Sequence, residues 1–148
     1  MDRQTQAQLA SLVDATSHIQ VDTLWFGPGY PALPRRLTLA AFSDPWMSYG
    51  HCVRVSEKWV VETSYITNYW ALETVRVERP GDDLGHTAAA VTMDGQKYVI
   101  DWTFSQFAHP WWNAESTDEP HPYVGTYDEW YERVSGFLAQ GLATAAYC

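Results

Sequence analysis

Cysteine is scarce in this chain, which has Cys52 and Cys148 and no others among its 148 residues. Two cysteines are too few for the disulfide framework of a small secreted domain, so we expect both to be free thiols. The histidines do not suggest a metal centre either. His51, His109 and His121 are irregularly separated, and no Cys-x-x-Cys or His-x-x-x-His spacing occurs. We therefore expect no metal site and no bound cofactor.

Basic residues are also few. Nine Lys and Arg stand against eighteen Asp and Glu, which gives a formal net charge of -9. This charge would repel a phosphate backbone and an anionic lipid leaflet, so neither nucleic acid nor a membrane is an expected partner. No stretch approaches the ~18 apolar residues of a membrane helix, and residues 1–13 lack the apolar run of a secretory signal. These absences predict a cytoplasmic protein.

What the chain does have is apolar material for a core. Hydrophobic residues make up 46% of it and aromatic residues 15%, which is typical of a globular protein. Its length fits one domain, spanning residues 1–148. Apolar spacing predicts a helix from about Gln4 to Ala15, and the segment from Ile19 to Trp25 reads as extended. The Gly- and Pro-rich stretch from Gly27 to Pro34 is expected to be irregular.

Two further helices and a strand follow from local patterns. A helix is expected to begin at or just before Cys52, because small and apolar residues then form one stripe: Cys52, Val53, Ser56, Trp59, Val60 and Thr63. The run from Leu72 to Glu78 alternates as a strand does. Thr126 and Glu129 form a capping box that opens a last helix, with one face made of Trp130, Val134, Phe137 and Leu138.

The clearest local structure is a β-hairpin. Asp94-Gly95 separates two β-rich runs, from His86 to Met93 and from Gln96 to Thr103, and Asp-Gly is a preferred two-residue hairpin turn. If Met93 pairs with Gln96, one face carries His86, Ala88, Ala90, Val99, Asp101 and Thr103. The sequence therefore predicts an α+β fold in which the helix at Cys52 packs on an antiparallel sheet.

This register brings an imidazole and a carboxylate together. His86 and Asp101 would be diagonal neighbours, with backbones ~7 Å apart, which their side chains can span with a hydrogen bond. The carboxylate would fix the imidazole tautomer and stabilise its charged form. Ala88 and Ala90 leave room on the same face, and we expect the helix that begins at Cys52 to approach there.

Cys52 has the position of a nucleophile. The unpaired N–H groups at a helix N-terminus stabilise a thiolate, and a nearby histidine stabilises it further. The backbone N–H of Cys52, with a donor from the stretch that starts at Trp46, would hold the oxyanion of an attacked carbonyl. Gln106, just past the hairpin, is a secondary candidate that would line the site. His51 is expected to be structural, because the position beside Cys52 points elsewhere.

On these residues the chain resembles the papain-like and transglutaminase-like superfamily of cysteine enzymes. Gly50-His51-Cys52-Val53, His86 at the head of an apolar strand, and the run from Val99 to Phe107 carry the likeness. The motif Asp-Trp-Thr-x-x-Gln-Phe at Asp101 to Phe107 is similar to small actinobacterial and phage proteins and to papain-fold toxin domains. The chain departs from papain-type proteases at Trp46-Met47-Ser48, where they carry a glutamine.

The resemblance implies amide chemistry on a protein or peptide substrate: peptide cleavage, deamidation or acyl transfer through a thioester. Cys52 would be the nucleophile, His86 the general base and Asp101 the residue that orients it, as in a toxin-like or phage effector. Two alternatives stay open: an inert scaffold of the same fold that binds a protein partner, and an acyltransferase with the same residue order. The oligomeric state is not predicted.

Overall fold

The chain folds into an α+β structure, as its sequence predicts. The structure is a computed structural model and describes residues 1–25, 33–43, 51–81, 84–108 and 122–141. In these ranges the α-helices are α1 (Arg3–Thr16), α3 (Cys52–Ile66) and α4 (Tyr127–Ala139), and the short 3-10 helices are η1 (Leu39–Ser43) and η2 (Phe104–Ala108). None of the helices in this described part is long and apolar enough to cross a membrane.

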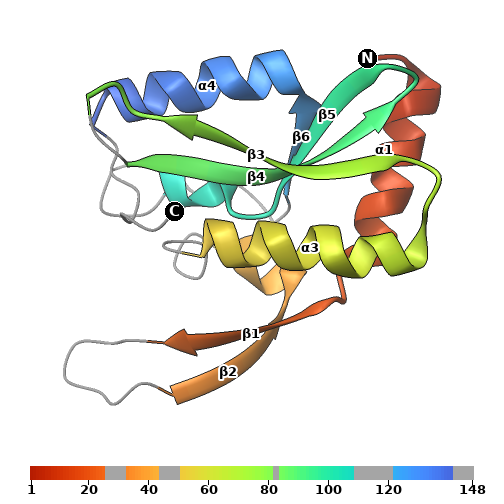
Figure 1. Cartoon of the computed structure of the whole chain (residues 1–148), viewed down its shortest axis with the longest axis horizontal. Coiled ribbons are helices and arrows are strands. Elements are labelled where there is room, and N and C mark those ends of the chain that lie inside the picture. Colours follow the sequence, from red (N-terminus) through yellow and green to blue (C-terminus); the bar gives the residue numbers. More distant parts are fainter. Residues whose placement is uncertain (26–32, 44–50, 82–83, 109–121, 142–148) are drawn as a thin grey trace.

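A four-stranded antiparallel sheet forms the centre of the molecule (Figure 1). Its strands lie in the order β3 (Ala71–Glu78), β4 (Gly85–Met93), β5 (Gln96–Asp101) and β6 (Tyr123–Thr126). The predicted hairpin and its register are confirmed, since Met93 pairs with Gln96 across Asp94 and Gly95. Both turn residues have positive φ, 50° and 78°, as a type I′ turn requires. The second strand ends at Asp101 rather than at Thr103.

The first strand of the chain belongs to a separate two-stranded ribbon. β1 (Gln20–Trp25) pairs antiparallel with β2 (Leu33–Thr38), and Figure 1 shows this ribbon projecting away from the central sheet. The extended reading of the segment up to Trp25 is confirmed, whereas a strand containing Pro34 was not expected. A two-stranded ribbon has an unpaired edge on each strand, which is where a sheet tolerates proline.

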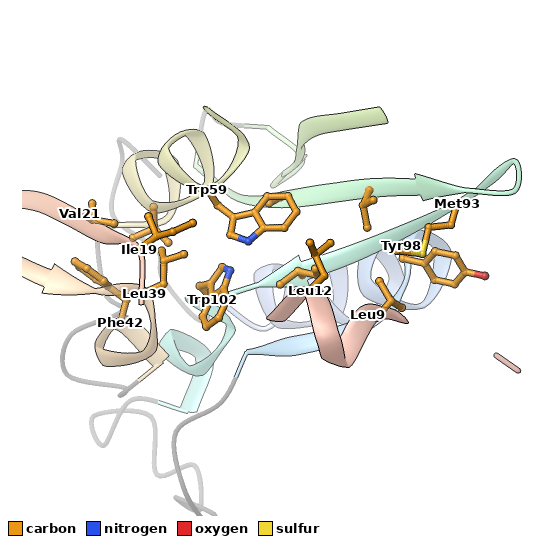
Figure 2. Close-up of a cluster of buried hydrophobic side chains, with 14 residues drawn as sticks. Leu9, Leu12, Ile19, Val21, Leu39, Phe42, Trp59, Met93, Tyr98 and Trp102 are labelled. Atoms are coloured by element: carbon orange, nitrogen blue, oxygen red, sulfur yellow. The ribbon is translucent and has the colours of Figure 1, made fainter. Parts of the chain in front are cut away.

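Helices cover both faces of the central sheet, and each face has its own apolar cluster. On one face, α1 and α3 pack against β4 and β5, with Leu12, Trp59 and Trp102 at the centre of the cluster (Figure 2). On the other face, α4 packs through Trp130, Val134 and Leu138. In Figure 1 the sheet accordingly lies between α4 and α3. Because both faces are covered, β4 is buried along almost its whole length.

The helix boundaries follow from capping. The side chain of Asp2 accepts a hydrogen bond from the backbone N–H of Thr5 at 2.7 Å and so closes the first turn of α1. The Thr126 hydroxyl accepts from the N–H of Glu129 at 3.3 Å, which confirms the predicted start of α4. The third helix begins at Cys52, as expected, after an N-cap at His51 that makes no side-chain capping bond.

Candidate functional site

A histidine and an aspartate on neighbouring strands form a buried hydrogen bond. Nε2 of His86, at the start of β4, lies 2.6 Å from Oδ2 of Asp101, at the end of β5. Their exposed fractions are 0% and 1%. The contact predicted from the hairpin register is therefore confirmed, and it lies in an environment that excludes water.

Asp101 accepts hydrogen bonds from three residues. Its Oδ2 atom accepts the indole N–H of Trp130 at 2.8 Å, in addition to the bond from His86. Its Oδ1 atom accepts the backbone N–H of Thr103 at 3.1 Å and the Thr103 hydroxyl at 3.4 Å. The indole and the backbone amide can only donate, so this set of partners suits an ionised carboxylate.

The second ring nitrogen of His86 is also occupied. Nδ1 lies 2.9 Å from the side-chain nitrogen of Gln106, which sits on η2 and is 1% exposed. Because the carboxylate of Asp101 can only accept, the ring proton is on Nε2 and Nδ1 accepts from the amide of Gln106. The described arrangement thus holds a neutral imidazole of one defined tautomer.

Aromatic side chains enclose the imidazole. The ring of Phe107 meets that of His86 edge-on, with centroids 4.9 Å apart, and the indole of Trp130 lies at 6.1 Å. Phe107 stacks in turn on Phe137 of α4, with centroids 4.9 Å apart. Hydrogen bonds in such an apolar setting are electrostatically stronger than in water, and an unpaired polar group there would be costly.

Cys52 is the first residue of α3 and is fully buried. The expectation of a free thiol is wrong, because Cys52 is disulfide-bonded. The only other cysteine of the chain is Cys148, which lies outside the described residues. Cysteine scarcity excludes a framework of several disulfides, but it does not exclude a single bond between distant positions.

The helix that carries Cys52 packs on the other face of the sheet from His86. Val55 and Trp59 of α3 belong to the same cluster as Ala89 and Val91, which alternate with the residues that share a face with His86. The space beside Ala88 and Ala90 is filled by α4 instead. Our expectation that the cysteine helix would approach this alanine face is therefore wrong.

The start of α3 nevertheless lies near the start of β4. The hydroxyl of Ser56 donates to the backbone carbonyl of Thr87 at 3.3 Å, and both atoms are buried. Thr87 directly follows His86, and Ser56 is one helical turn after Cys52. Figure 1 shows the first turns of α3 at the same end of the sheet as the beginning of β4. Within the described residues, the side chain of His86 is hydrogen-bonded to Asp101 and Gln106.

Of the other candidate residues, Gln106 and His51 lie in the described part of the chain. Gln106 contacts His86 directly, so it lines the site as expected. Trp46 lies outside the described residues, as do His109 and His121. His51 packs its ring against Phe42, with centroids 5.3 Å apart. Among the residues that the structure describes, no group of three or more His, Cys, Asp and Glu could hold a metal ion.

Trp130 is a site residue that the sequence reading placed only in the apolar face of the last helix. An indole on a helix face predicts burial, and the partner of its N–H depends on which sheet face the helix covers. Tryptophan does usually find a hydrogen-bond acceptor when it is buried. The sequence therefore implied a buried indole N–H that needs an acceptor. Which residue accepts depends on how α4 packs on the sheet.

Comparison of the chain with protein-family models, with curated proteins and with solved structures finds no significant match in any of the three. The resemblance to papain-like and transglutaminase-like enzymes therefore rests on the residues quoted for it.

Proposed function

We propose that the chain, once Cys52 is reduced, is a cysteine-dependent amide hydrolase of papain-like or transglutaminase-like fold. The observation that carries this proposal is the buried hydrogen bond of 2.6 Å between His86 and Asp101. A buried polar pair contributes less to stability than apolar packing of the same volume does. An oriented imidazole, by contrast, is what general acid–base catalysis requires.

The position of Cys52 supports its role as the nucleophile. A thiolate at the N-terminus of α3 would be stabilised by the positive end of the helix dipole. The bond from Ser56 to the carbonyl of Thr87 ties the second turn of the same helix to the residue next to His86. The start of α3, where Cys52 lies, is thus at the same end of the sheet as the start of β4, where His86 lies (Figure 1).

The proposed reaction has two steps. The sulfur of Cys52 attacks the amide carbonyl carbon while Nδ1 of His86 takes the thiol proton. The C–N bond then breaks, and the imidazolium returns the proton to the leaving amine, which leaves a thioester. In the second step Nδ1 removes a proton from water and the hydroxide adds to the thioester carbon. The C–S bond then breaks, and the imidazolium returns the proton to the departing sulfur, which restores the thiol and the neutral imidazole. Asp101 stays ionised and holds the ring throughout.

Two features of the described arrangement must change before this chemistry. The disulfide of Cys52 must be reduced, and Nδ1 of His86 must exchange the amide of Gln106 for the thiol. A reducing compartment such as the cytoplasm keeps such thiols reduced. We therefore propose that the enzyme acts there, on a protein or peptide, by cleavage or by deamidation.

Thiol reactivity tests the proposal. The Cys148→Ser variant carries Cys52 as its single thiol and can be treated with iodoacetamide at neutral pH, with mass spectrometry to follow alkylation. A free cysteine is only a few per cent thiolate there, so an activated Cys52 should react at least about tenfold faster than a cysteine peptide. His86→Gln should abolish the difference. Alkylation no faster than that of the peptide would overturn the proposal.

Acyl transfer gives a second readout. p-Nitrophenyl acetate should acetylate Cys52 and release a burst of p-nitrophenolate, followed by slower turnover. The mass of one acetyl group on Cys52 would identify the thioester. Cys52→Ser should show neither the burst nor the added mass.

The hydrogen bond between Nδ1 of His86 and Gln106, together with the disulfide of Cys52, favours a second candidate function. A chain in which Gln106 never leaves His86 would be a scaffold of the same fold that binds a protein without turnover. The alkylation assay separates the two functions, because the scaffold predicts an unreactive Cys52 even after reduction.

A further inference from the structure

We propose that Trp130 is a positioning residue of this site, acting through Asp101 on the orientation of His86. Any effect of Trp130 on catalysis rests on the proposed function. Its effect on the orientation of the histidine–aspartate pair does not. Trp130 lies on α4, so this helix would contribute a residue to the site in addition to packing on the sheet.

The indole donates to the same oxygen as the imidazole does. Oδ2 of Asp101 accepts from Trp130 at 2.8 Å and from His86 at 2.6 Å. Both bonds of Thr103 go to the other oxygen, Oδ1. A carboxylate with donors on one oxygen only could rotate about its terminal bond. Donors at both oxygens fix its plane, and the indole fixes the side on which Oδ2 meets the imidazole.

The indole itself is held in place by the start of α4. Trp130 lies about one turn after Thr126, the residue that caps α4, and it is 0% exposed. Its ring lies 6.0 Å from that of Tyr127 on the same helix and 6.1 Å from that of His86. Because packing already fixes the ring, the N–H is aimed at Asp101 with little conformational entropy left to lose.

A role in packing alone would require only the ring. The hydrogen bond adds an N–H that can only donate, so the oxygen of Asp101 that it meets must act as an acceptor. Without this donor, Oδ2 would have His86 as its single described partner. Thr103 would still hold Oδ1, but nothing besides the imidazole would fix the position of Oδ2, so the orientation of the imidazole would be less strictly defined.

The test uses Trp130→Phe in the full chain, reduced and carrying Cys148→Ser. ¹⁵N NMR of the histidine ring should show the Nε2-protonated tautomer of His86 in the parent. In Trp130→Phe the Nε2 proton should exchange with solvent roughly tenfold faster, since a hydrogen bond to a charged group has been lost. Alkylation of Cys52 should slow by a similar factor if the proposed function holds.

The chain offers two matched controls. Trp59→Phe also removes a buried indole N–H bond, the one to the hydroxyl of Thr16 at 3.0 Å, on the other face of the sheet. Trp102→Phe removes a buried indole whose N–H has no hydrogen-bond partner among the described residues. Both should leave the exchange rate of the His86 proton unchanged. Equal effects of Trp59→Phe and Trp130→Phe on this exchange rate would overturn the proposal. An unchanged exchange rate in Trp130→Phe would overturn it as well.

A variant that fails to fold can be replaced by a closer mimic. β-(3-benzothienyl)alanine at position 130 keeps the bicyclic shape and puts sulfur in place of N–H, and it should reproduce the faster exchange. The NMR result decides the role of Trp130 whether or not Cys52 is reactive. If the parent protein shows a slow Cys52 while the exchange still responds to Trp130, the proposed function fails and the positioning of His86 stands.

Discussion

The side-chain amide of Gln106 lies 2.9 Å from Nδ1 of His86, while Asp101 holds the other ring nitrogen. The imidazole is therefore satisfied on both sides within the described structure. Loss of either partner would leave a polar atom without a bond in a place that water does not reach.

Gln106→Leu tests the cost of leaving Nδ1 unpaired. Leucine has a similar size but cannot donate, so we expect the free energy of unfolding to fall by about 1–3 kcal/mol. Urea denaturation measures this change. The matched control is Gln96→Leu on the exposed start of β5, where the effect should stay within about 0.5 kcal/mol. Equal effects at the two positions would show that the bond to His86 contributes nothing.

Asp101→Asn removes the charge at nearly constant shape. One of its two oxygens becomes an NH₂ group, which then faces either the N–H of Thr103 or the donors of His86 and Trp130. We expect a loss of roughly 3 kcal/mol in the free energy of unfolding. Asp94→Asn, in the hairpin turn, should be nearly neutral, because asparagine suits its positive φ of 50°. Guanidinium denaturation of both variants checks this contrast.

The register that joins His86 to Asp101 depends on the turn, so two glycines make a paired test. Gly95 has a φ of 78° and open space around it, and Ala there should destabilise by about 1–2 kcal/mol through the backbone alone. Gly136 lies inside α4, also with open space, and Ala there should stabilise by about 1 kcal/mol. Thermal denaturation should move in opposite directions for the two variants.

Tyr123 gives a prediction for alkaline pH. It lies opposite Asp101 in the β5–β6 pairing, and burial, assisted by nearby Glu129, raises the pKa of Tyr123 from 10.0 to about 12. The folded state therefore holds this proton more tightly than the unfolded state does. Its contribution to stability is fully present below pH 10 and is lost as pH rises to about 12.

Melting temperatures measured across this pH range test whether stability falls as the pH rises. Tyr123→Phe should remove part of the alkaline decrease, whereas Tyr69→Phe, at a side chain that is 82% exposed, should leave it unchanged. An alkaline decrease of the same size in Tyr123→Phe would show that this hydroxyl does not couple to folding.

The sequence predicted the parts of the site that depend on local rules. Asp94-Gly95 defines its own turn, and the turn defines the register from which the contact between His86 and Asp101 follows. The capping box at Thr126 likewise marks the start of α4 without any tertiary information.

The sequence could not predict which helix covers which face. Both faces of β4 are apolar, so alternation does not distinguish the side of Ala88 from the side of Ala89. The small size of Ala88 and Ala90 indicated that some element approaches closely, and the structure shows α4 packed on this face. The disulfide of Cys52 was missed for a related reason, because it joins positions that no local pattern connects.

The bond from Trp130 to Asp101 also has a consequence for synthesis on the ribosome. β4 and β5 leave the exit tunnel before α4 does, so a nascent chain can form the hairpin while Oδ2 of Asp101 still lacks its indole donor. The histidine therefore acquires its final orientation only once α4 has packed on the sheet and brought Trp130 to Asp101.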